Sequence, residues 1–62
     1  MLLVDALNLK HKDEVFVKST RKIVTVLYIV PHISQKIVLI TTADGENRVR
    51  TYSQKEIDKK VP

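Results

Sequence analysis

The stretch Lys-Ile-Val-Thr-Val-Leu-Tyr-Ile-Val at residues 22–30 decides the fold of this 62-residue chain. It is dense in β-branched and aromatic residues, which pack well on a pleated sheet. Side chains alternate between the two faces of a strand, and here both faces are apolar. In so small a protein, such a strand must lie centrally in a sheet or bend around the core. We expect it to end at Pro31, because proline cannot donate to a central ladder.

Three shorter segments of β type surround this stretch. Residues 14–18 (EVFVK), 36–42 (KIVLITT) and 47–52 (NRVRTY) each predict a strand. Residues 32–35 are expected to form a loop. The Asp-Gly pair at residues 44–45 predicts a tight hairpin turn, since glycine tolerates the positive φ that such turns require.

The two ends of the chain are read from their local patterns. Ser53-Gln54-Lys55-Glu56 matches the S-x-x-E capping box, in which serine and glutamate satisfy each other's backbone donors. We therefore expect a helical or 3-10 turn from Ser53, with Ile57 as its inward anchor and residues 59–62 as a frayed end or a closing strand. Residues 1–9 fit either one or two helical turns or an irregular strand.

These elements predict an all-β fold, a small barrel of four to five antiparallel strands with a one-turn C-terminal helix or 3-10 turn. The length allows one domain, with residues 1–9 as a lead-in segment and residues 10–62 as the barrel. The apolar fraction of 44% and the charged fraction of 29% argue against disorder. There is no cysteine, so neither disulfides nor a thiolate metal site can supplement the small core.

The order of elements resembles the SH3-like small barrels, in particular the KOW and Tudor-type modules. In those modules a polar turn leads into a V-x-V strand, a place taken here by residues 12–17, with Lys12 where glycine is usual. A second glycine expected near Arg21 is also missing. Asp44-Gly45 matches their later hairpin, and residues 53–57 match their one-turn helix before the last strand.

The resemblance implies a module that binds nucleic acid or protein, and it does not choose between them. Tudor-type domains that read methylated side chains use a cage of three or four aromatic rings. This chain has three aromatic residues in all, Phe16, Tyr28 and Tyr52, which does not favour a cage.

The net charge of +4 and the pI near 9.6 favour polyanionic partners. Cations neutralise phosphates, and an aromatic ring gives a base a face on which to stack. Two alternatives stay open: an acidic protein partner, or solvated charges on the outer face of an edge strand that guard it against aggregation. The candidate nucleic-acid-binding residues lie at the first hairpin and on one face of the fourth strand: Lys18, Arg21, Lys22, Arg48, Arg50 and Tyr52.

Other functional classes find little support in the residues. His11 and His32 are too few for a metal site, which needs three or four convergent ligands. Adjacent Asp13 and Glu14 would point to opposite faces of a strand and cannot act as a paired acid and base. We therefore expect no enzyme activity, no cofactor and no small-molecule substrate.

The N-terminal sequence also bears on location. Asp5 interrupts the first apolar run too early for a signal peptide, and no apolar stretch approaches the ~18 residues of a membrane span. We expect a cytoplasmic protein that does not enter a membrane.

The chain carries more apolar residues than a single small core needs. A contiguous exposed patch of them would mark a protein contact, and homodimerisation would stabilise the folded state by mass action. The other interpretation is that the lead-in segment folds over the end of the barrel. The surplus residues are Leu2, Leu3, Val4, Leu7, Leu9, Val24, Val26, Val30, Ile33 and Ile37.

Overall fold

The computed structural model describes residues 1–59 and shows five strands, one short α-helix and two 3-10 turns. The predicted all-β class is confirmed, and the lead-in segment is helical rather than extended. In chain order the elements are α1 (Leu3–Leu7), β1 (Glu14–Val17), β2 (Lys22–His32), η1 (Ile33–Gln35), β3 (Ile37–Ala43), β4 (Val49–Ser53), η2 (Gln54–Glu56) and β5 (Ile57–Lys59).

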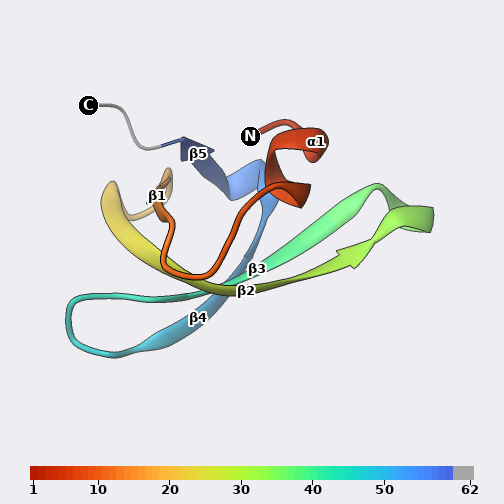
Figure 1. Ribbon diagram of the computed structural model, residues 1–62. Helices are drawn as coiled ribbons and strands as arrows, with labels where there is room; N and C mark the ends of the chain where they lie inside the picture. Colours follow the sequence, from red (N-terminus) through yellow and green to blue (C-terminus); the bar gives the residue numbers. More distant parts are fainter. Residues whose placement is uncertain (60–62) are drawn as a thin grey trace.

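All five strands belong to one antiparallel sheet with the order β4-β3-β2-β1-β5 (Figure 1). The sheet is strongly curved, and α1 covers its concave side. Strands β4 and β5 are its two edges and do not pair, so the sheet is not closed by hydrogen bonds. The 3-10 turn η2 joins one edge strand to the other instead.

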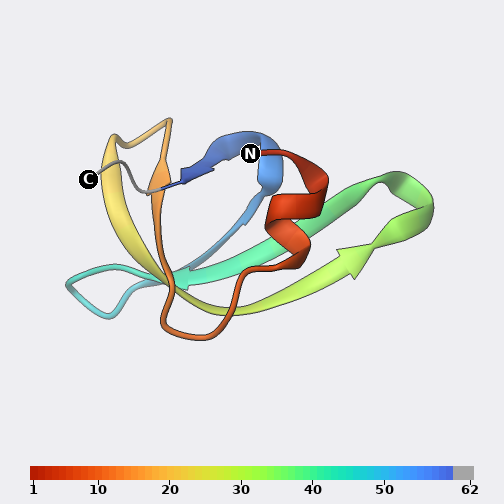
Figure 2. The ribbon, with the colours of Figure 1, turned by 45° about the horizontal axis from the view of Figure 1, so that its top comes forward.

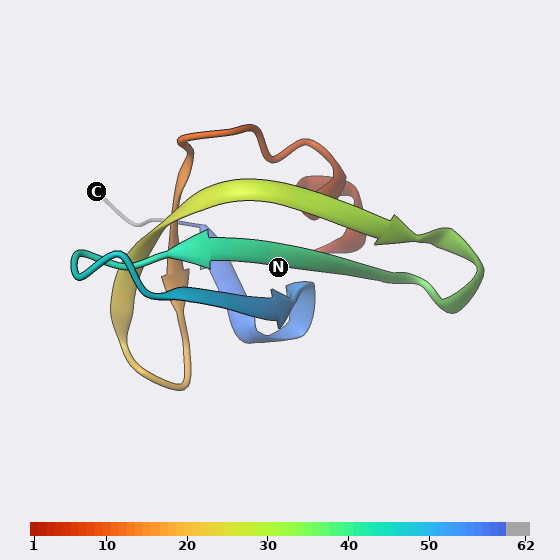
Figure 3. The ribbon, with the colours of Figure 1, turned by 90° about the horizontal axis from the view of Figure 1, so that it is seen from below.

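Strand β2 is central, as its sequence predicts, and a bulge explains why both of its faces are apolar. The register against β3 shifts between Val26 and Tyr28. Before the bulge Val24 and Val26 are buried, whereas after it Ile29 takes the inner face opposite Ile40. Tyr28 and Val30 are therefore exposed. They lie in the paired residues 28–32 of β2 and 37–41 of β3, which we call the β2–β3 arm; Figure 3 shows these two strands running side by side away from β1.

Two expected boundaries differ from the structure. Strand β2 continues past Pro31, which pairs with Val38. The proline is tolerated because β1 pairs only with residues 22–25, so the far half of β2 has an open edge where no N–H is needed. The expected loop at residues 32–35 is the end of β2 followed by the 3-10 turn η1.

The core lies between the curved sheet and α1. The lead-in segment folds over the sheet through Ala6, which is fully buried, and Leu3 and Leu9, which pack against the core. Leu2 and Val4 point away from it and are exposed. The buried apolar residues are Ala6, Val15, Val17, Val24, Val26, Val38, Ile40 and Ile57.

The N-terminal amine is docked inside this structure (Figure 2). The Met1 ammonium donates hydrogen bonds to the carbonyl oxygens of Gln54 at 3.0 Å and Ile57 at 2.7 Å. It also lies 3.6 Å from a carboxylate oxygen of Asp58. The amine thus ties the lead-in segment to η2 and β5.

The turn predicted at Ser53 is confirmed, but the capping box is not. Ser53 makes no side-chain cap hydrogen bond to η2. The neighbouring Gln54 is buried instead; its Oε1 accepts from the Val38 N–H at 2.9 Å and its Nε2 donates to the Lys36 carbonyl at 2.9 Å. A side-chain bridge to β3 therefore fixes this turn, and Ile57 beside it is fully buried as expected.

Among residues 1–59, four residues other than glycine have a left-handed backbone: Lys12, Arg21, Lys36 and Asn47. In the β3–β4 turn the positive φ falls on Asn47 (62°), whereas Gly45 has none, which corrects the expectation for the Asp-Gly pair. A three-residue loop explains this, since Asn47 N–H donates to the Asp44 carbonyl and Asp44 N–H to the Arg48 carbonyl.

Within residues 1–59, no helix is long and apolar enough to cross a bilayer. The expected closing strand is present as β5 up to Lys59, and the rest of that expectation, at residues 60–62, lies outside the described residues.

Candidate functional site

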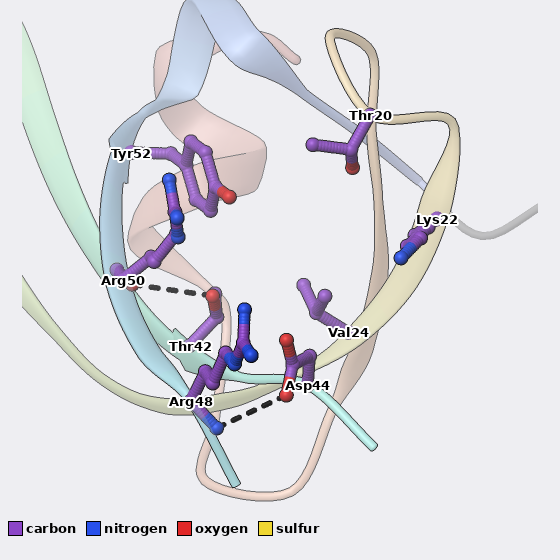
Figure 4. Close-up of a pocket in the computed structure, with 8 residues that line it drawn as sticks. All are labelled: Thr20, Lys22, Val24, Thr42, Asp44, Arg48, Arg50 and Tyr52. Carbon is purple, nitrogen blue, oxygen red and sulfur yellow. Dashed lines mark hydrogen bonds between the residues drawn. The ribbon is translucent and has the colours of Figure 1, made fainter. Parts of the chain in front are cut away.

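A cavity of about 180 Å³ opens between the β1–β2 and β3–β4 turns (Figure 4). We call it the basic cavity. Strand β2 supplies one wall of this cavity, and β3 and β4 supply the other. Its lining residues are Thr20, Lys22, Val24, Thr42, Asp44, Arg48, Arg50 and Tyr52.

The strand register explains why Arg50 and Tyr52 of β4 face this cavity. Residues directly opposite each other on paired strands share a face. Arg50 lies opposite the buried Thr42, and Tyr52 lies opposite the buried Ile40. Both side chains are thus on the core-facing side of the sheet, whereas Val49 is 61% exposed on the other side.

This placement corrects the idea that Arg48, Arg50 and Tyr52 decorate the outer face of an edge strand. Strand β4 is an edge, as that idea requires. Its Arg and Tyr side chains, however, occupy the concave face where the apolar core ends and the cavity begins. Lys22 joins them from the opposite wall, two residues before the buried Val24 on the same face of β2.

The structure gathers four of the six predicted residues: Lys22, Arg48, Arg50 and Tyr52. Lys18 and Arg21 do not line the cavity. The Lys18 ammonium lies 3.7 Å from an Asp58 carboxylate oxygen, toward β5, and the Lys18 N–H donates to the Glu56 carbonyl. Arg21 occupies the left-handed position of the β1–β2 turn (φ 57°) and is exposed.

The cavity carries three cations and one carboxylate, that of Asp44. Arg48 makes an ion pair with Glu46 (Nε to Oε2, 3.5 Å), but both side chains are more than two-thirds exposed, so this pair adds little stability. Among residues 1–59, Lys22 and Arg50 have no ion-pair partner. With three cations and one carboxylate, the residues that line the cavity carry a net charge of +2.

Asp44 holds the β3–β4 turn with one of its carboxylate oxygens. Its Oδ1 accepts hydrogen bonds from the backbone N–H of Arg48 at 3.0 Å and of Glu46 at 2.8 Å. These two bonds lower the pKa of Asp44, and the charges of Arg48 and Lys22 act in the same direction. Asp44 is therefore ionised at neutral pH.

Sequence reasoning treated Asp44 as a turn residue only and missed Thr20, Val24 and Thr42. Thr42 is buried, and its hydroxyl donates to the Arg50 carbonyl at 3.2 Å, which supports the β4 wall. For the β2 wall the sequence did contain a signal. Lys22 alternates with Val24 and Val26, and this alternation places the lysine on the core-facing side of β2. The opposite wall depends on how β3 pairs with β4, which the sequence does not display.

The cavity offers cations, hydroxyl groups, a carboxylate and the face of one aromatic ring. Such groups bind anions and heterocyclic bases. In residues 1–59, no three His, Cys, Asp or Glu side chains lie close enough together to hold a metal ion. The ring of His11 is used elsewhere, with Nδ1 2.9 Å from the Leu27 carbonyl oxygen.

Comparison of the chain with family models, with curated proteins and with solved structures finds no match.

Proposed function

We propose that this protein is a non-catalytic module that binds single-stranded nucleic acid in the basic cavity. One observation carries the proposal: Lys22, Arg48 and Arg50 converge with Tyr52 on one concave face from strands far apart in the sequence. Cations that track a backbone beside an aromatic ring are the elements of sequence-tolerant single-strand binding. The uncompensated charge of Lys22 and Arg50 favours a phosphate ligand.

The resemblance to SH3-like modules of the KOW and Tudor type supports a binding role. The five-stranded order, with a 3-10 turn before the last strand, agrees with it. At Lys12 the resemblance leads one to expect glycine, and the backbone there is left-handed (φ 76°); a second glycine is expected near Arg21, whose own backbone is left-handed (φ 57°). Glycine favours that conformation, so the expected glycines and the observed backbone agree even though the residues differ.

The test measures binding of a fluorescent single-stranded oligonucleotide as a function of salt. Lys22→Gln/Arg50→Gln removes two cavity cations, and we expect weaker binding and a salt slope shallower by about 1.4, since each phosphate contact on a single strand contributes about 0.7. The control is Lys10→Gln/Lys55→Gln, which removes the same charge from exposed sites outside the cavity.

Equal affinities of the two double variants would reject the cavity as the site. A further variant, Lys18→Gln/Arg21→Gln, measures the two predicted residues that lie outside the cavity. We expect it to behave like the control, because its cations do not reach the same ligand. No binding of any single strand by the wild-type chain would reject the function altogether.

A second candidate function, protein interaction or homodimerisation, is favoured by the outer face of the β2–β3 arm. Tyr28, Val30 and Ile33 are 57%, 41% and 60% exposed there. Tyr28 and Val30 lie on β2 and Ile33 begins η1. Exposed apolar residues that gather on a surface are the usual mark of a protein contact. Sedimentation at micromolar concentration tests it: a dimer that persists at high salt and dissociates in Val30→Asp would support it, and a monomer would contradict it.

A further inference from the structure

Asp44 has one carboxylate oxygen that the fold does not use. Oδ1 holds the turn through two backbone N–H groups, whereas Oδ2 accepts no hydrogen bond from any residue among 1–59. Figure 4 shows one oxygen of the Asp44 carboxylate on the dashed bond to the Arg48 N–H and the second oxygen pointing away from that bond; Asp44 is one of the residues that line the cavity. The turn therefore presents an acceptor to whatever enters.

An ionised carboxylate oxygen accepts hydrogen bonds and cannot donate them. It attracts an exocyclic amino group of a base and repels a carbonyl oxygen in the same place. Carboxylates recognise the N4 amino group of cytosine in this way. Cytosine and uracil differ at that position, where uracil carries an oxygen, and at N3, which carries a hydrogen only in uracil. Adenine and hypoxanthine differ in the same way, at position 6 and at N1.

We propose that Asp44 makes the basic cavity selective for bases that carry an exocyclic amino group, so that cytosine is bound ahead of uracil. This inference rests on the proposed binding of single-stranded nucleic acid. Figure 4 places Tyr52 and Asp44 at opposite ends of the β4 wall with the Arg48 and Arg50 side chains between them. The base stacked on Tyr52 and the base read by Asp44 are therefore different nucleotides of one strand.

The turn alone does not require an aspartate. The amide oxygen of an asparagine can accept from the same Glu46 and Arg48 N–H groups, although more weakly than a carboxylate does, and those two donors would fix the orientation of the amide. Asp44→Asn therefore keeps the turn and exchanges only the cavity-facing acceptor for a donor. This variant therefore tests the base selectivity of the cavity while the turn stays folded.

The experiment compares the dissociation constants of oligocytidylate and oligouridylate of equal length, and of a strand containing adenine against the same strand containing hypoxanthine. For the wild-type chain we expect about a tenfold preference for the amino-bearing member of each pair, the size of one charge-assisted hydrogen bond. In Asp44→Asn we expect the preference to disappear or invert, while overall affinity rises because a negative charge has left the cavity.

The outcomes separate this inference from the function on which it rests. Binding without preference in the wild-type chain, or a preference that survives Asp44→Asn, would overturn the inference and leave the function standing. Absence of binding to every strand would overturn both. The preference of the wild-type chain is measured in two comparisons, cytosine against uracil and adenine against hypoxanthine. The test therefore does not depend on whether the variant folds.

Discussion

Two regions of this molecule contain amino, amide or guanidinium groups and differ in whether those groups have partners within the fold. At the N-terminal docking site, formed by Met1, Gln54 and Ile57, the polar groups engage backbone atoms within the fold. In the basic cavity, Lys22 and Arg50 have no ion-pair partner among residues 1–59. The first arrangement stabilises a small protein, and the second leaves two cations without an ion-pair partner in the described part of the chain.

The contrast follows from what burial costs. A buried polar atom without a partner loses its hydration, so the fold must satisfy it. In the described part of the chain no buried side-chain polar atom lacks a partner. The cavity cations Lys22, Arg48 and Arg50 are exposed, so they meet no such requirement. Substitutions should therefore change stability at the docking site and binding at the cavity.

The largest expected effect is that of Gln54→Leu at the docking site. This change leaves the buried Val38 N–H and the Lys36 carbonyl without their side-chain partners. We expect the free energy of unfolding to fall by about 2–4 kcal/mol, since each unsatisfied buried group costs about 1–3 kcal/mol. Chemical denaturation measures it, and Gln35→Leu on exposed η1 is the control, expected to stay within about 0.5 kcal/mol. Equal effects of the two variants would show that the bridge does not fix η2.

A smaller loss is expected when the Met1 amine of this chain is acetylated. The ammonium has three N–H groups, whereas the acetylated amide retains one. The amide therefore cannot donate a separate hydrogen bond to each of the Gln54 and Ile57 carbonyls. We expect a loss of about 1–2 kcal/mol in the free energy of unfolding, measured on synthetic chains with free and acetylated amines. Asp58→Asn is the companion variant. Its carboxylate is about half exposed, so a loss as large as that from acetylation would assign the docking to charge rather than to the carbonyls.

These two regions also differ in how far the sequence predicts them. Strand segments follow from local alternation, so the central position of β2 and the burial of Ile57 were both predictable. The bulge after Val26 was not, because it appears only when β2 is set against β3. The role of Gln54 was hidden in the same way, since its partners lie far away in the sequence, Val38 on β3 and Lys36 just before that strand.

The basic cavity was half predictable for a related reason. The shared face of Arg48, Arg50 and Tyr52 follows from alternation within one segment. That this face is concave and that Lys22 stands across from it depend on the curvature of the whole sheet. Lys18 was grouped with Lys22 by closeness in sequence, yet the β1–β2 turn directs it toward Asp58.

In the cavity, neutralising a cation should scarcely alter stability. Arg50→Gln removes an exposed charge that shares the cavity with Lys22 and Arg48. We expect the free energy of unfolding to change by less than about 0.5 kcal/mol, with a slight gain at low salt because repulsion among the cations is relieved. Thermal denaturation at two salt concentrations measures it, beside Lys55→Gln as an exposed control outside the cavity. A loss above about 1 kcal/mol would mean that Arg50 belongs to the fold as Gln54 does.

The smallest expected effect is a pH dependence of the stability that comes from Asp44. This residue both holds the β3–β4 turn and lines the cavity. Backbone N–H groups of Arg48 and Glu46 lower the pKa of Asp44 in the folded state, below the value of 3.8 that it has without them. A carboxyl with a lowered folded pKa contributes stability above its unfolded pKa and loses it as the pH falls through the folded one. Stability should therefore decline more steeply below about pH 4 in the wild-type chain than in Asp44→Asn, which has no proton to gain. NMR titration of the Asp44 carboxyl carbon gives the pKa directly. An unshifted pKa of Asp44, or identical acid unfolding of the two chains, would show that Oδ1 does not hold the turn. Both oxygens of Asp44 would then face the cavity without a partner in the turn.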